Sequence, residues 1–307
     1  MTSLAGGEGL VDVHAHFYHA DSGRSDWPEV NAARFRAGDR IGITWHVASV
    51  LGTYGHRSPT YFPSPVDVVV GNDAMLAIAA RESSRVRMYA TVNPNYTDHA
   101  LGEIERCAAA GAVGVKLLAS RRADDRLLDP IAALAAERGL PILHHIWQHR
   151  RREWPSQEIS DGADLARLAA RHPRATFILA HIGGGGDWAH TFPAIADYTN
   201  ILPDVSGSGV DRGMLDAALE SLGPERLLWG CDLTIETGLA KLRALEAIGL
   251  EKEKLSLIRW KNAVRIFPPE TFPGLTDSHA ARARSPKRAA RAPGVRAPAA
   301  VPDADGR

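Results

Sequence analysis

The sequence predicts an α/β protein, in particular a (β/α)8 TIM barrel with a disordered C-terminal tail. Between residues 10 and 270, short apolar runs alternate with longer helical patterns, and polar residues cluster at the ends of the apolar runs. The alternation alone also fits a doubly wound open sheet. A closed barrel is favoured because closure brings the last strand beside the first, which gathers the polar residues into one group.

Eight apolar runs are the candidate strands, and their continuous apolar character is typical of strands buried in a parallel sheet. They are Leu10–Phe17, Ile43–Leu51, Val86–Val92, Val113–Leu118, Pro141–Ile146, Thr176–His181, Ile201–Ser206 and Leu227–Asp232. Helical segments such as 129–139, 161–173 and 211–223 lie between them. Each opens with an aspartate as a candidate N-cap and ends near glycine or proline.

The composition indicates one soluble barrel domain, residues 1–275, followed by a tail, residues 276–307. The tail is rich in Ala, Arg and Pro, so it cannot bury enough apolar surface to offset the entropy of ordering. With 36 basic and 36 acidic side chains, the chain has no overall field for nucleic acid or a membrane surface. Only two cysteines and no signal-peptide pattern indicate a cytoplasmic protein.

Two histidines close the first predicted strand, at the rim where barrel proteins form their sites. His14 and His16 lie one residue apart, so the two-residue period of a strand points both to the same face. Two imidazoles on one rigid strand suit a divalent metal ion. The alternative is a pair of histidines bonded to water or backbone, and the further polar strand ends favour the metal.

Later strands bring three more candidates to the same rim. Of the adjacent histidines in the fifth strand, alternation lets only one point into the barrel; we assign His145 as the ligand and His144 to packing against the helices. His181 and Asp232 end the sixth and eighth strands, where a buried carboxylate needs a cation or hydrogen bonds. The four glycines after His181 indicate a tight turn rather than a phosphate cradle, and helix capping is the alternative for Asp232.

These motifs together resemble the amidohydrolase superfamily, in particular its amidohydrolase-related branch, which includes the aminocarboxymuconate semialdehyde decarboxylase-like enzymes. The resemblance covers about residues 10–270 through VDVHAHF, TVNP, GVKLL, LPILHH, LAHIGG, GCD and KNAVRIF. It implies a divalent ion, commonly zinc, bound by His14, His16, His145 and Asp232. It also implies that His181 acts as an acid/base or orients a water molecule.

Two departures from the branch stand beside these matches. Cys231 replaces the usual serine before the aspartate, which leaves the ligand intact. Ile146 and Trp147 replace a small polar pair after the strand-5 histidine, which puts the substrate class in question. Trp147 and Arg57 fall in predicted loops at the rim and are candidate substrate contacts, with ordinary solvated loop positions as the alternative.

Lys116, in GVKLL, is a candidate for a second metal or for the substrate. It matches a lysine that is carbamylated and bridges two ions in two-metal amidohydrolases, whereas in the mononuclear branch the same residue binds a substrate carboxylate. A lysine that extends to the rim without either role is a third interpretation. One ion is favoured over two, because only this lysine argues for the second.

The predicted chemistry is that of a metal-dependent hydrolase. A zinc ion lowers the pKa of its bound water from about 15.7 to about 7, and Asp232 and His181 would relay the proton while an amide, ester or lactone is attacked. A metal-dependent non-oxidative decarboxylase of a small aromatic or muconate-like acid is the alternative; a non-catalytic metal-binding scaffold is a remote one. The expected partners are small-molecule substrates, without nucleic acid or membrane, and a homodimer is compatible with the sequence.

Overall fold

The computed structural model describes residues 9–50, 58–146, 157–182, 188–207, 209 and 213–275. Within these ranges a seven-stranded parallel sheet follows the order of the chain. Its strands are β1 (Val11–Phe17), β2 (Trp45–Val50), β3 (Val86–Val92), β4 (Gly114–Leu117), β5 (Ile142–His145), β6 (Phe177–Ala180) and β7 (Ile201–Pro203). The predicted tail, 276–307, and the glycine run at 183–186 lie outside the described residues.

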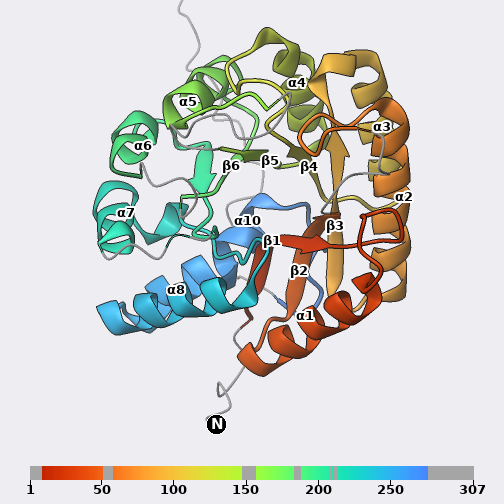
Figure 1. The fold of residues 1–307 in the computed structure, drawn as a ribbon. Coiled ribbons are helices and arrows are strands. Elements are labelled where there is room, and N and C mark those ends of the chain that lie inside the picture. Colours follow the sequence, from red (N-terminus) through yellow and green to blue (C-terminus); the bar gives the residue numbers. More distant parts are fainter. Residues whose placement is uncertain are drawn as a thin grey trace, which may run out of the picture.

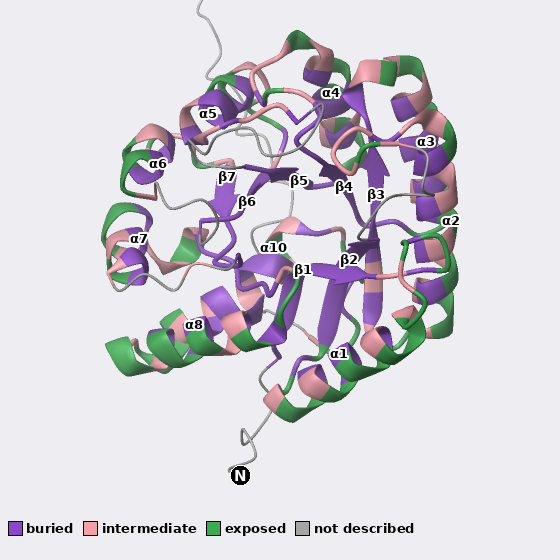
Figure 2. Ribbon diagram, viewed as in Figure 1, coloured by how far each residue is buried: buried purple, intermediate pink, exposed green. Residues whose placement is uncertain are grey.

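Helices alternate with the strands and surround them. They are α1 (Trp27–Ile41), α2 (Pro65–Arg81), α3 (Thr97–Ala109), α4 (Asp129–Arg138), α5 (Gly162–Arg171), α6 (Trp188–Ile195), α7 (Met214–Leu222), α8 (Ile235–Ile248), α9 (Lys252–Ser256) and α10 (Asn262–Ile266). Figure 1 shows α1 to α8 as a ring around the strands. In Figure 2 the strands are buried, whereas the helices turn exposed faces outward. The predicted TIM barrel is confirmed, and none of the described helices has the length and apolar character needed to span a bilayer.

The chain closes the barrel with residues 227–232, but not as the regular eighth strand that the sequence predicts. This segment makes two isolated bridges, Asp204 with Leu228 and Ala15 with Asp232. The ladder is interrupted because its amides bond elsewhere: Trp229 N–H donates to the carbonyl of Ile258 at 3.1 Å. A closed ring results nonetheless, since the segment bonds to β7 on one side and β1 on the other.

Apolar side chains fill the interior of the barrel over most of its height. The inner cluster includes Val11, Val13, Val47, Tyr89, Leu143, Ile178, Leu202 and Leu228. At the amino ends of the strands, Trp260, Phe267 and Phe272 belong to the same cluster. Arg87 at the start of β3 donates to the carbonyl of Thr271 at 2.8 Å, so the C-terminal segment seals this end.

A β-bulge in β1 determines which way its histidines point. Asp12 pairs with His46 and Ala15 with Ala48, so β1 holds one more residue than β2 between these pairs. Before the bulge, Val11 and Val13 face the interior; a regular strand would then turn His14 away from it. The extra residue shifts the alternation, and the histidines of β1 face the interior as well.

The predicted helix caps are partly confirmed. Asp161 caps α5, where its Oδ1 accepts from the amide of Asp164 at 3.0 Å. For α4 the prediction was wrong: Asp129 is the first helical residue, and its carboxylate instead binds Arg171 and His172, at 2.8 Å each. The third proposed cap, at position 211, lies outside the described residues.

Candidate metal centre

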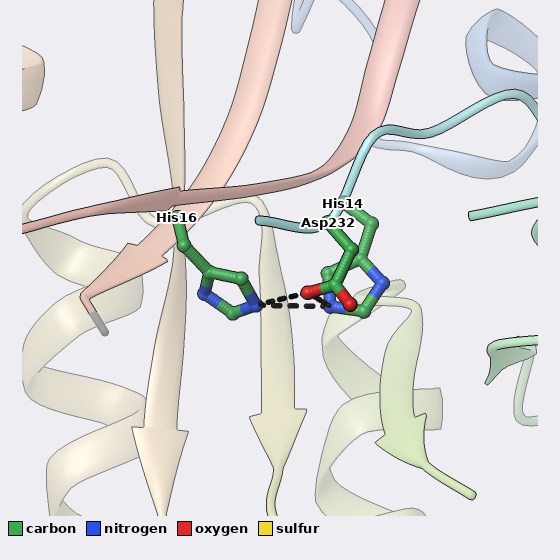
Figure 3. A group of neighbouring side chains, drawn as sticks. All are labelled: His14, His16 and Asp232. Atoms are coloured by element: carbon green, nitrogen blue, oxygen red, sulfur yellow. Dashed lines mark hydrogen bonds and ion pairs between the residues drawn. The ribbon is translucent and has the colours of Figure 1, made fainter. Parts of the chain in front are cut away.

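Three side chains converge at the carboxyl rim of the barrel. The Nε2 atoms of His14 and His16 lie 3.1 Å apart. Oδ1 of Asp232 lies 3.2 Å from Nε2 of His16 and 3.7 Å from Nε2 of His14. Potential ligand atoms of the three residues all lie within 4.8 Å of one another. Figure 3 shows both rings and the carboxylate directed at a common point.

The hydrogen bonds around His14 indicate that its Nε2 carries the lone pair. Its Nδ1 lies 3.1 Å from Oδ2 of Asp204 and 3.0 Å from Oγ of Ser206. Burial raises the pKa of Asp204, but its interaction with His14 more than offsets this and holds the pKa below its usual value. An ionised carboxylate only accepts, so Nδ1 of His14 donates to it. This carboxylate–histidine contact is the arrangement that orients histidines bound to a metal.

His16 is held in a similar way by the neighbouring strand. Its Nδ1 lies 3.1 Å from Oγ of Ser49 in β2, and burial lowers the pKa of His16 to about 4. A neutral imidazole is the form that binds metal ions. Two ring nitrogens in contact with each other and with a carboxylate need a cation or a proton among them, so the donor set fits a divalent ion.

The backbone at Asp232 has the left-handed conformation, with a φ of 57°. Aspartate tolerates this region better than most residues, and such conformations concentrate at functional sites. Two residues earlier, a Cβ on Gly230 would lie 3.1 Å from Cβ of His14. Glycine therefore lets the closing segment approach β1 closely enough for the carboxylate to meet the histidines.

His181 and His145 extend the group beyond these three ligands. Nε2 of His181 lies 3.3 Å from Oδ2 of Asp232. The ring of His145 stands edge-on to His181, with centroids 5.4 Å apart, and also packs against the ring of Tyr61, with centroids 5.4 Å apart. His145 is thus part of the cluster but is not among the three close ligands, and its role as a ligand stays a prediction.

The neighbouring His144 is fully buried, with its Nδ1 2.9 Å from the carbonyl of His145. Leu143 belongs to the inner cluster, so alternation along β5 turns His144 away from the interior. Burial lowers the pKa of His144 to about 4, which keeps the ring neutral at physiological pH. This agrees with the packing role that the sequence predicts.

Lys116 of β4 brings a buried amine to the cluster. The residue is only 1% exposed, and its Nζ lies 3.0 Å from Nε2 of His14. Burial lowers the pKa of Lys116 to about 8, against the opposing charges of Asp232 and Asp204. The amine of Lys116 thus lies in direct contact with one of the candidate ligands.

Sequence reasoning missed the residues that support the histidines. Asp204 and Ser206 follow Leu202 at two-residue spacing, the same pattern that identifies the other rim residues. Ser49 follows Val47 near the end of the second strand with the same spacing, so alternation also places its side chain on the inner face. Arg57 and Trp147 lie outside the described residues, so their roles stay predictions.

A closed parallel barrel with histidines and an aspartate at its carboxyl rim is the architecture of metal-binding TIM barrels. The chain belongs to the amidohydrolase family Amidohydro_2, which matches residues 11–268. The resemblance inferred from the motifs is thereby confirmed. A comparison with curated proteins finds no match.

Solved structures with the same fold include three decarboxylases of aromatic acids. A 2,6-dihydroxybenzoate decarboxylase complexed with 2,6-dihydroxybenzoate is 16% identical, covers 84% of this chain and 98% of its own, and gives a TM-score of 0.65. A dihydroxybenzoic acid decarboxylase from Polaromonas, with bound manganese and 2-nitroresorcinol, is 18% identical with coverages of 84% and 96% and a TM-score of 0.65. A 5-carboxyvanillate decarboxylase from Sphingomonas paucimobilis is 17% identical with coverages of 84% and 98% and a TM-score of 0.63. These likenesses establish the fold.

Proposed function

We propose that this protein is a metal-dependent decarboxylase that releases the carboxylate of a small aromatic acid as CO2, without oxidation. The observation that carries the proposal is the buried group of His14, His16 and Asp232 with the amine of Lys116 beside it. The names of the structural neighbours support the reaction class, and the bound acid and manganese in two of them support its substrate and metal. They favour decarboxylation over the hydrolysis that the sequence suggested.

His14, His16 and Asp232 would hold a divalent ion, with His145 as a predicted fourth ligand. The ion supplies a Lewis acid that polarises oxygen atoms of the substrate. Among the described residues one such group of three is present, which supports a single ion per chain. Either zinc, the metal implied by the motifs, or manganese, which is bound in one of the neighbours, suits this mixed nitrogen and oxygen donor set.

Lys116 is proposed to bind the substrate carboxylate. Its ammonium group lies 3.0 Å from Nε2 of His14, so an anion placed at the ligand cluster comes within its reach. Its burial keeps water away, which strengthens the attraction between the ammonium group and a carboxylate. A fixed cation of this kind is what a decarboxylase requires and a hydrolase of neutral esters or lactones can omit.

His181, in contact with Asp232, is proposed to supply the proton. When the bond between the ring carbon and the carboxylate breaks, CO2 leaves and the electron pair remains on the ring carbon. That carbon must gain one proton, so an acid must lie near it. The 3.3 Å contact between Nε2 of His181 and Oδ2 of Asp232 orients the imidazole for this transfer.

A substrate panel tests the reaction class. Protein loaded with Zn²⁺ or Mn²⁺ is incubated with dihydroxybenzoates, 5-carboxyvanillate, muconate-like acids, lactones, esters and amides, and both CO2 and hydrolysis products are measured. We expect CO2 from at least one aromatic acid, no CO2 from metal-stripped protein, and loss of turnover with retention of metal in His181→Gln. Hydrolysis of a carbonyl substrate without CO2 release from any acid would refute the proposal and favour the hydrolase function that the sequence predicts.

A further inference from the structure

A buried ion pair lies behind the candidate metal ligands, on the helix side of β1. Asp12 of β1 is 0% exposed, and its Oδ2 accepts from Nη2 of Arg34 in α1 at 2.8 Å. The same oxygen lies 3.2 Å from Nδ1 of His46 in β2. Neither Asp12 nor Arg34 faces the interior of the barrel, so neither can touch a substrate there.

The second oxygen of Asp12 bonds the backbone on both sides of the barrel closure. Its Oδ1 accepts from the amide of His14 at 3.2 Å, which satisfies an amide within the β-bulge. It also accepts from the amide of Cys231 at 2.9 Å, next to the third ligand. One carboxylate thus ties the backbone of two ligand-bearing segments to a single point.

Arg34 bonds the backbone that follows Cys231 in the closing segment. Its Nη1 donates to the carbonyl of Asp232 at 2.9 Å and to that of Leu233 at 3.2 Å. These are the carbonyls at and just after the left-handed residue. The guanidinium therefore bridges the carboxylate of Asp12 and the backbone that presents the carboxylate of Asp232.

We propose that the Asp12–Arg34 ion pair is a positioning device that sets the separation of the metal ligands on β1 and on the closing segment. The inference rests on the metal centre of the proposed function. The pair acts through the backbone: it fixes the bulge on one side and the left-handed turn on the other. Residues that orient ligands in this way typically change metal affinity about 10- to 100-fold when they are replaced.

The first test is Arg34→Lys. Lysine keeps a positive charge for Asp12, but its single ammonium group lacks the planar fork that reaches the carboxylate and two carbonyls at once. We expect the affinity for Mn²⁺, measured by electron paramagnetic resonance, and for Zn²⁺, measured by competition with a chelator, to fall at least about 10-fold. With Co²⁺ at saturation, the visible absorption spectrum is expected to change as the ligand geometry relaxes.

Arg226→Lys is the matched control. Arg226 also donates through its guanidinium to backbone carbonyls, including those of Ile195 and Ile201, but at the amino end of the barrel. The same chemical change is expected to lower the melting temperature while leaving the metal affinity and the Co²⁺ spectrum of the folded protein unchanged. The comparison separates positioning of the ligands from general loosening.

Asp12→Asn provides a second variant if Arg34→Lys does not fold. The amide keeps an oxygen for the two backbone amides but loses the charge that holds Arg34, so weaker metal binding is again expected. Wild-type affinity in folded Arg34→Lys or Asp12→Asn would overturn the inference, as would an equal loss in Arg226→Lys. A wild-type protein that binds none of these ions would instead refute the metal centre itself.

Discussion

The two ends of the barrel interior hold opposite kinds of side chain. At the amino end, Trp45, Phe267 and Phe272 form an aromatic plug, with ring centroids of Phe267 and Phe272 5.5 Å apart. At the carboxyl end, the layer consists of polar side chains such as His14 and Lys116, equally buried. Apolar packing and the candidate metal site therefore lie at opposite ends of the barrel axis.

The comparison shows that the buried polar side chains of the carboxyl rim depend on hydrogen-bond partners. Each polar group at the rim needs a partner, because an unpaired buried polar group is costly. Asp204 pairs with His14 and Ser49 with His16, whereas Phe267 and Phe272 at the other end have no polar side-chain atoms to pair. Substitutions at the rim are thus expected to change binding and catalysis, whereas substitutions in the plug are expected to change stability.

The largest effect is expected for Asp232→Asn. Asparagine also tolerates the left-handed backbone, so the variant removes the charge without disturbing the turn. Because a lost ligand exceeds a lost supporting contact, metal affinity should fall more than about 100-fold and CO2 release should cease. Metal content by mass spectrometry checks this, and a variant that is still fully loaded with metal would contradict the role of Asp232 as a ligand.

At the opposite end, Phe267→Ala should reduce the free energy of unfolding by about 3–5 kcal/mol, because Phe267 is 1% exposed and the cavity is poorly refilled. The metal affinity of the folded fraction should not change. Denaturant unfolding and metal titration of the same sample measure both quantities. Weakened metal binding in the folded protein would show that the two ends are coupled.

Lys116→Met sharpens the comparison within the rim. It should leave one ion per chain, because the close ligands are intact. The KM for an acid substrate should rise about 10- to 100-fold, as expected for the loss of a charged hydrogen bond of about 1.5–3 kcal/mol. Steady-state kinetics and metal content test the two parts separately. A halved metal content would reveal a second ion and a carbamylated lysine.

A pH-dependent effect on stability is expected at Lys241 of α8, whose Nζ donates to the carbonyl of Gly207. Burial lowers the pKa of Lys241 from 10.5 to about 8. Between these values the unfolded chain binds a proton that the folded chain does not, so folded stability rises with pH across this window. The melting temperature of wild type relative to Lys241→Met should therefore increase from pH 8 to 10.5. If the difference in melting temperature between the two proteins does not change with pH, the lowered pKa of Lys241 is contradicted.

Deletion of residues 276–307 should have the smallest effect. Their composition lacks the large apolar residues that a packed segment needs, so neither the melting temperature nor the metal content should change. Calorimetry of the full chain and of a chain ending at residue 275 makes the comparison. A marked loss of stability would show that the domain boundary is wrong.

Much of this architecture could be predicted because it follows from local patterns. Apolar runs identified seven strands and the segment that closes the barrel, and the polar residues at the ends of the first and last runs identified His14, His16 and Asp232, which the barrel brings together. The eighth strand was predicted as regular, but its ladder is broken by bonds to groups remote in sequence, such as the Asp12 carboxylate on Cys231.

The supporting residues depend on contacts that no local pattern records. Arg34 reads from the sequence as an ordinary helix residue, yet it donates to a carbonyl 198 positions away. The bulge is equally hidden. Simple alternation from Val11 and Val13 places His14 on the outer face, and only the pairing of β1 with β2 shows the extra residue that returns it to the interior.

The closure of the barrel by residues 227–232 has a consequence for how the site comes into being. The two segments that carry the ligands meet across a sequence separation of 219 residues, measured between Asp12 and Cys231. Forming this contact closes a loop that spans nearly the whole domain, which costs chain entropy. A nascent chain that ends at β7 carries both β1 histidines but not their carboxylate. An ion that bridges the two segments needs both of them in place, so its binding would stabilise the closed barrel.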